Sequence, residues 1–142
     1  MDNDMNYADM KTRKEIDNAG KSYYDGSPFE KLVKLSSKSK GTFFEMIVHE
    51  FLESNRHDVK RAESSDYDRL IDGVKTEIKG STRWKGSYSF RWQQLRMDED
   101  YDDVIFLAVD YNEIRLYSSS KSKLIDTMNG GMVLPEGCSF KQ

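Results

Sequence analysis

Three side chains in one short stretch of the chain have the types and spacing needed to hydrolyse a phosphodiester bond. Asp68 precedes the dipeptide Asp72-Gly73, and Glu77 and Lys79 follow it, two residues apart. Asp-Gly between two strand-like runs favours a two-residue hairpin turn, because both central positions need positive φ. Pairing outward from that turn places Asp68 opposite Glu77, with Lys79 on the same face of the hairpin.

Two carboxylates directly across a strand pair repel each other, so the pair needs a compensating positive charge. A divalent cation supplies it, and Mg²⁺ suits a few carboxylate oxygens because it keeps several of its waters. Such an ion polarises a phosphate and lowers the pKa of a bound water, which Lys79 would orient or help to deprotonate. The stretch therefore predicts a metal-dependent phosphodiesterase site. A surface hairpin with ordinary ion pairs is the alternative interpretation.

Asp72 is closer to Glu77 in sequence, but it sits at the tip of the expected turn. At about 3.3 Å rise per residue, the tip lies about 15 Å from Glu77, too far to share a metal ion. Asp68 is therefore the predicted ligand. Asp66 projects to the same face near Lys79 and remains an alternative.

An aspartate, a hairpin and then Glu-Ile-Lys resembles the signature of the PD-(D/E)XK nucleases, the superfamily that includes small type II restriction endonucleases. The resemblance covers roughly residues 41–117. It implies that Asp68, Glu77 and the carbonyl of Ile78 hold Mg²⁺, for which Mn²⁺ can substitute. It also implies a restriction-endonuclease-like fold.

The same resemblance implies a further glutamate on an upstream helix. In a helix over residues 42–54, Glu45 lies at the edge of the apolar stripe and Glu50 lies almost opposite, toward solvent. Glu45 is therefore predicted to join the metal site, with a solvent-facing position as the alternative. Gln94 is predicted to position the lysine, a phosphate or the water, as glutamines do in some relatives; a packed polar role, or Gln93 in its place, remains open.

The charge distribution is compatible with a nucleic-acid partner. The net charge is −3, but basic residues concentrate between Lys75 and Arg96. A local basic stripe is enough for phosphate contact on an acidic protein. Arg83, Lys85 and Arg91 are predicted to contact double-stranded DNA, although a solvated surface is the default for such charges.

The remaining pattern predicts an α/β fold with a mixed central sheet flanked by helices. Residues 104–109 form a continuous apolar run, typical of a strand buried on both faces, and residues 114–117 alternate as a further strand. We expect helices over residues 5–18, from Ser27-Pro28, over 42–54 and over 120–128, a linker over 36–41 and an irregular tail. The predicted division is an N-terminal helical arm or accessory segment, residues 1–40, and a nuclease core, residues 41–142, within a chain of single-domain size.

We expect an intracellular, cytoplasmic protein. No apolar run reaches the roughly 18 residues that a membrane helix needs, and the N-terminus is acidic where a signal peptide is basic. The single cysteine excludes an internal disulfide.

The interpretation that joins these observations is a Mg²⁺-dependent DNA endonuclease, of the sequence-specific restriction type. Symmetric cleavage of both strands would need a homodimer, because one domain this small carries one active site. The alternatives are a structure-selective or repair nuclease, such as a resolvase or nickase, and a catalytically silent DNA-binding module of the same fold.

Overall fold

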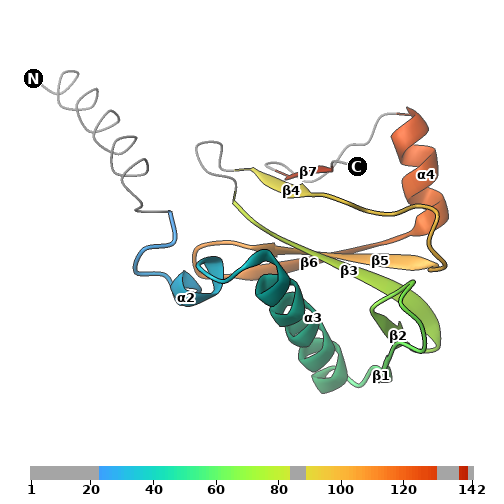
Figure 1. Ribbon diagram of the computed structural model, residues 1–142, viewed down its shortest axis with the longest axis horizontal. Helices are drawn as coiled ribbons and strands as arrows, with labels where there is room; N and C mark the ends of the chain where they lie inside the picture. Colours follow the sequence, from blue (N-terminus) through green and yellow to red (C-terminus); the bar gives the residue numbers. More distant parts are fainter. Residues whose placement is uncertain (1–22, 84–88, 131–137, 141–142) are drawn as a thin grey trace, which may run out of the picture.

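The computed structural model describes residues 23–83, 89–130 and 138–140. Its centre is a five-stranded sheet in the order β1-β2-β3-β5-β6 (Figure 1). These strands are β1 (Val59–Arg61), β2 (Arg69–Ile71), β3 (Val74–Thr82), β5 (Asp103–Val109) and β6 (Ile114–Ser120). The pair β3–β5 is parallel and the other neighbouring pairs are antiparallel, which confirms the predicted mixed sheet.

Further elements cover both faces of the sheet (Figure 1). On one side lie the helices α2 (Glu30–Val33) and α3 (Ser37–Ser54). On the other lie the helix α4 (Lys121–Gly130) and a two-stranded sheet of β4 (Phe90–Trp92) and β7 (Cys138–Phe140). The predicted α/β class with flanking helices is confirmed. None of the helices in the described ranges has the length and apolar character that crossing a membrane requires.

The tail was expected to be irregular, but residues 138–140 form β7, parallel to β4, so that prediction is wrong. A strand of three residues is too short for alternation to reveal it. The helix expected over residues 5–18 lies outside the described residues.

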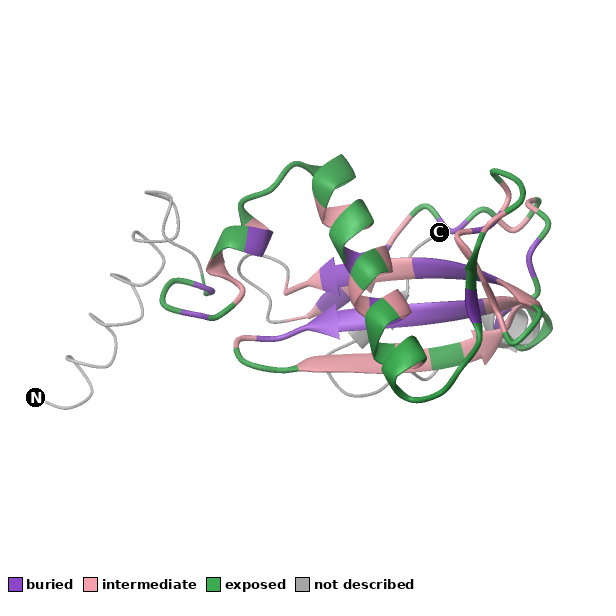
Figure 2. Ribbon diagram, turned by 90° about the horizontal axis from the view of Figure 1, so that it is seen from below, coloured by how far each residue is buried: buried purple, intermediate pink, exposed green. Residues whose placement is uncertain are grey.

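The strand β5 forms the centre of the core, as its apolar run predicted. Residues 104–109 are all buried. Val104, Phe106 and Ala108 pack with Trp92 on the β4 side. Ile105, Leu107 and Val109 pack with Val48 of α3 on the other side. Figure 2 shows the buried residues concentrated in the central strands.

Helix α3 begins earlier than the sequence suggested. Ser36 is its N-cap, and the Ser36 hydroxyl accepts a hydrogen bond from the Ser39 amide at 3.2 Å. The prediction of a linker over residues 36–41 is therefore wrong. Ser36, a residue type common in loops, caps and stabilises the start of the helix instead. The division drawn at residue 40 falls inside α3, and Tyr24 and Leu32 from the N-terminal segment lie in the core.

A glycine in β3 sets how closely α3 approaches the sheet. A Cβ atom at Gly80 would lie 2.1 Å from the buried ring of Phe44. The glycine thus lets the helix carrying Glu45 pack directly on the strand that carries Glu77 and Lys79.

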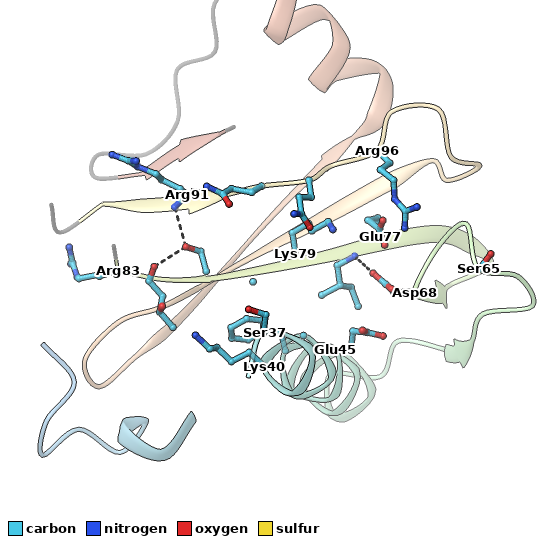
Figure 3. Close-up of a pocket in the computed structure, with 18 residues that line it drawn as sticks. Ser37, Lys40, Glu45, Ser65, Asp68, Glu77, Lys79, Arg83, Arg91 and Arg96 are labelled. Atoms are coloured by element: carbon cyan, nitrogen blue, oxygen red, sulfur yellow. Dashed lines mark hydrogen bonds between the residues drawn. The ribbon is translucent and has the colours of Figure 1, made fainter. Parts of the chain in front are cut away.

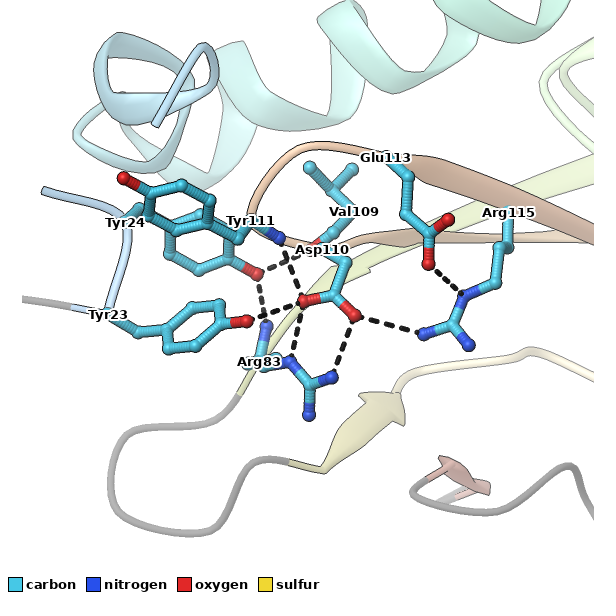
Figure 4. A network of polar contacts seen from close by, with 8 residues as sticks. All are labelled: Tyr23, Tyr24, Arg83, Val109, Asp110, Tyr111, Glu113 and Arg115. Carbon is cyan, nitrogen blue, oxygen red and sulfur yellow. Dashed lines mark hydrogen bonds and ion pairs between the residues drawn. The ribbon is translucent and has the colours of Figure 1, made fainter. Parts of the chain in front are cut away.

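The turn after β5 anchors the N-terminal segment through Asp110 (Figure 4). The buried Asp110 carboxylate accepts hydrogen bonds from Arg83 Nε at 2.8 Å and Nη2 at 2.7 Å. It also accepts from Arg115 at 3.2 Å and from the Tyr23 hydroxyl at 3.0 Å. The Tyr24 hydroxyl donates to the Val109 carbonyl. Hydrogen bonding to Arg83 holds the pKa of Asp110 well below its usual range.

The variant Asp110→Asn is expected to lower the free energy of unfolding by about 3 kcal/mol, because it leaves two guanidinium groups without their carboxylate. Urea titration at pH 7 measures the loss. The matched control is Glu113→Gln, whose exposed carboxylate lies 3.8 Å from Arg115 and is expected to contribute less than about 1 kcal/mol. Equal losses in the two variants would contradict the assignment.

Candidate active site

The residues predicted to do chemistry meet in a cleft along one edge of β3 (Figure 3). Among the described strands, β2 pairs with residues 74–76 of β3 only, so that edge of β3 is open from Glu77 to the end of the strand at Thr82, after which Arg83 bridges to Phe90. The cleft has a volume of about 620 Å³ and lies between α3 and residues 91–96. Its lining includes the predicted site residues Glu45, Asp68, Glu77, Ile78, Lys79, Arg83, Arg91 and Gln94. Lys85 lies outside the described residues.

The hairpin that positions these residues has the predicted turn and register. Asp72 has φ 50° and Gly73 has φ 80°, as the two-residue turn requires. The paired residues are Ile71 with Val74, Leu70 with Lys75 and Arg69 with Thr76. The Asp72 carboxylate accepts from the Asp58 amide at 2.9 Å and contacts His57 Nδ1 at 2.7 Å, so Asp72 supports the turn and does not line the cleft.

Asp68 and Glu77 form a close carboxylate pair where the ladder ends. The Asp68 amide donates to the Thr76 carbonyl at 3.0 Å, and Asp68 Oδ2 accepts from the Ile78 amide at 2.7 Å. Glu77 is only 8% exposed. Burial, the hydrogen bond with Asp68 and the negative charge of Asp68 raise the pKa of Glu77 to about 8. The repulsion expected from the sequence is therefore present, and at neutral pH the metal-free pair retains a proton.

Lys79 is one of the positive groups near this pair; another is Arg96, which is paired with Glu99. Within the described part of the chain the Lys79 ammonium forms no hydrogen bond and no ion pair, and its charge acts to lower the pKa values of Glu77 and Glu45. The side chain lines the cleft beside the two acids (Figure 3). It is thus available to a water or a phosphate.

Glu45 is bound by an arginine that the sequence analysis did not identify. Arg69 Nη1 donates to Glu45 Oε1 at 3.1 Å and to the Asp68 carbonyl at 2.8 Å. Arg69 Nε donates to His49 Nδ1 at 3.1 Å, and His49 Nε2 faces Glu53 at 3.3 Å. Burial and the charge of Asp68 raise the pKa of Glu45, and Arg69 opposes that rise. Arg69 therefore ties the α3 glutamate to the backbone of Asp68.

The donor set suits a hard divalent cation, although a three-carboxylate cage is not assembled. Across the described ranges, no three histidine, cysteine or acidic side chains converge as metal ligands. Glu45 is engaged by Arg69. Asp68 and Glu77 nevertheless offer two adjacent carboxylates, and burial together with Asp68 raises the pKa of Glu77. Hard cations such as Mg²⁺ bind such oxygens.

The other predicted residues occupy the walls of the cleft. The Arg83 guanidinium is held by Asp110 and lies 5.0 Å from the Phe90 ring. The Arg91 amide donates to the Ser81 hydroxyl at 3.0 Å. Gln94 is exposed and has φ 59°, an uncommon backbone conformation for a non-glycine residue. Gln93 also lines the cleft, so both glutamines remain candidates.

The architecture has a counterpart among solved structures. It is similar to a bacterial homing endonuclease, I-Ssp6803I, with a TM-score of 0.51 and 17% sequence identity over 63% of this chain and 69% of that chain. The two proteins share a fold. No family model matches the sequence, and no curated protein does.

Proposed function

We propose that this chain is a Mg²⁺-dependent DNA endonuclease of the PD-(D/E)XK kind. The observation that carries the proposal is the pair of half-buried Asp68 and buried Glu77 beside Lys79, in a cleft along an open strand edge. The similarity to a bacterial homing endonuclease supports it at the level of the fold. The pKa of Glu77 is raised to about 8, which means that its charged form destabilises the metal-free fold. A carboxylate pair that destabilises the fold is typical of a functional site.

Asp68, Glu77 and the Ile78 carbonyl would hold the metal ion, with Glu45 as a further ligand. When bound, Mg²⁺ would supply Lewis-acid activation of the phosphate and of a water. Lys79 would orient that water, help to take its proton and stabilise the negative charge that develops on the phosphate oxygens. Gln94 would position the lysine or the phosphate. Arg83, Lys85 and Arg91 would contact the backbone of double-stranded DNA.

We further propose sequence-specific cleavage by a homodimer, since one cleft of this kind acts on one strand. Mn²⁺ is expected to substitute for Mg²⁺. A structure-selective nuclease would use the same chemistry on branched or nicked DNA.

The proposal predicts metal-dependent cleavage of DNA by the full chain. Supercoiled plasmid and mixed-sequence linear DNA are incubated with Mg²⁺, with Mn²⁺ and with EDTA, and the products are separated on gels. Discrete fragments with either metal and none with EDTA are the expected result. Nicking or a smear would support metal-dependent hydrolysis of DNA but contradict sequence-specific cleavage. The function would then be that of a structure-selective or repair nuclease. If no DNA is cut under any condition, the proposed activity is wrong.

A further inference from the structure

The acidic side chains that line the cleft are not spread along its length (Figure 3). The acidic side chains Glu45, Asp68 and Glu77 gather at one end. At the other end lie Lys40 from α3 and Arg91 from β4, on opposite sides of the β3 edge (Figure 3). Arg96, at the acidic end, is paired with Glu99 at 3.1 Å.

The packing of α3 on β3 explains why Lys40 belongs to the basic end. Glu45 reaches Arg69 in the hairpin, at the start of the open edge. Phe44 packs on Gly80, further along the strand. Lys40 precedes Phe44 by one helical turn, so it lies beyond Gly80, toward the part of the cleft that Ser81 and Thr82 also line.

Lys40 is also chemically available. Among the described residues its ammonium forms no ion pair and no hydrogen bond. The nearest acid along its helix that lines the cleft, Glu45, is engaged by Arg69. An uncompensated lysine on a cleft wall suits a phosphate, which it binds as a compact point charge.

We infer that Lys40, with Arg91 across the cleft, binds the phosphate backbone of the DNA strand on one side of the bond that is cut. The inference rests on the proposed function and specifies that the strand is held on one side of the cut bond. The distance along β3 from Glu77 to Ser81 is about 13 Å. At about 3.4 Å of rise per nucleotide, the phosphate at Lys40 lies a few nucleotides from the scissile phosphate.

Lys38 provides a matched control for Lys40. It is the same residue type on the same turn of α3, it is exposed, and it does not line the cleft. Two residues along a helix correspond to a rotation of about 200°, so its ammonium points away from the cleft. If DNA binds in the cleft, replacing Lys40 should therefore weaken binding and replacing Lys38 should not.

The test is binding of a fluorescein-labelled 30-base-pair duplex by the full chain in EDTA, at a series of KCl concentrations. Lys40→Ala is expected to weaken binding several-fold and to reduce the slope of log K against log salt by about 0.9, the release of one counterion. Lys38→Ala is expected to leave the slope unchanged, and Lys40→Arg to restore it. Equal slopes for Lys40→Ala and Lys38→Ala would overturn the inference.

A second arm locates the contact. Single neutral methylphosphonates are placed at successive positions on each side of a cleavage site mapped with the wild-type protein. One position, on one side, is expected to weaken the wild type and to leave Lys40→Ala unaffected. If the wild type cuts DNA, but each methylphosphonate weakens binding by Lys40→Ala as much as binding by the wild type, this contact alone is refuted. A wild type that neither binds nor cuts DNA would refute the proposed function as well.

Discussion

Lys79→Ala is expected to cleave DNA about 100- to 10,000-fold more slowly than the wild type, with its fold and DNA affinity nearly unchanged. The loss follows from the position of the ammonium beside Glu77 in the cleft, where its charge already acts on both Glu77 and Glu45. In the proposed mechanism, its removal deprives the attacking water of a proton-transfer partner and the transition state of a fixed positive charge. The fold tolerates the change because the ammonium makes no hydrogen bond or ion pair with the described residues.

The measurement is the single-turnover rate of plasmid cleavage with Mg²⁺, alongside DNA binding with Ca²⁺ in its place. Lys75→Ala is the control, since Lys75 lies on the same strand but pairs with Asp100 at 2.6 Å and stays outside the cleft. The control is expected to cleave at the wild-type rate. A Lys79→Ala protein that cuts as fast as the control would rule out the proposed chemistry.

The hairpin that carries Asp68, Glu77 and Lys79 was predictable because its signals are local. The turn needs two residues with positive φ, and Asp72 and Gly73 have φ values of 50° and 80°. Once the turn is fixed, the register follows by counting, and the pair Arg69 and Thr76 is observed as predicted. The strand β5 was predictable for a different reason: a run of six apolar residues is tolerated only where both faces of a strand are covered.

The elements that the sequence did not reveal depend on contacts between distant segments. The strands β4 and β7 are three residues each and pair across more than 40 residues of chain. Neither is long enough to show a period. The start of α3 was missed because serine and lysine are common in loops, and only the hydrogen bond from Ser39 to the Ser36 hydroxyl identifies a cap.

The ion pair of Arg69 with Glu45 could have been predicted from the sequence. The predicted register places the Arg69 side chain opposite Thr76, on the face that α3 covers. An arginine on a covered face needs a carboxylate, and Glu45 on the inner edge of α3 was available. What the sequence could not give is the close approach of the helix, which depends on Gly80.

The variant Glu77→Gln is expected to be more stable than the wild type in EDTA at pH 8, by on the order of 2 kcal/mol, or about 6 °C in Tm. Burial and Asp68 raise the pKa of Glu77 from 4.5 to about 8. Below pH 4.5 the folded and unfolded states both hold the proton. Between pH 4.5 and 8 the unfolded chain releases it while the folded chain keeps it, so wild-type stability falls as pH rises. Glutamine at this position does not titrate.

Thermal unfolding of both proteins at several pH values measures the effect. The gap in Tm is expected to widen from about pH 4.5 to pH 8 and to remain constant above it. Glu50→Gln, an exposed change on α3, is the control and should show no such trend. A gap that narrows as pH rises would contradict the assignment of the raised pKa to Glu77.

Adding Mg²⁺ to the same samples separates a metal site from a structural carboxylate pair. A ligand that binds only the folded state stabilises it by RT ln(1 + [L]/Kd), and the charge on Glu77 is part of the proposed binding energy. The wild type should therefore gain stability from millimolar Mg²⁺ at pH 8, and Glu77→Gln should gain much less, which reduces or reverses the gap seen in EDTA. Equal gains would mean that the ion binds elsewhere. The Glu77 carboxylate is then expected both to destabilise the metal-free fold at pH 8 and to strengthen the binding of Mg²⁺, because its buried charge is compensated only when the ion is bound.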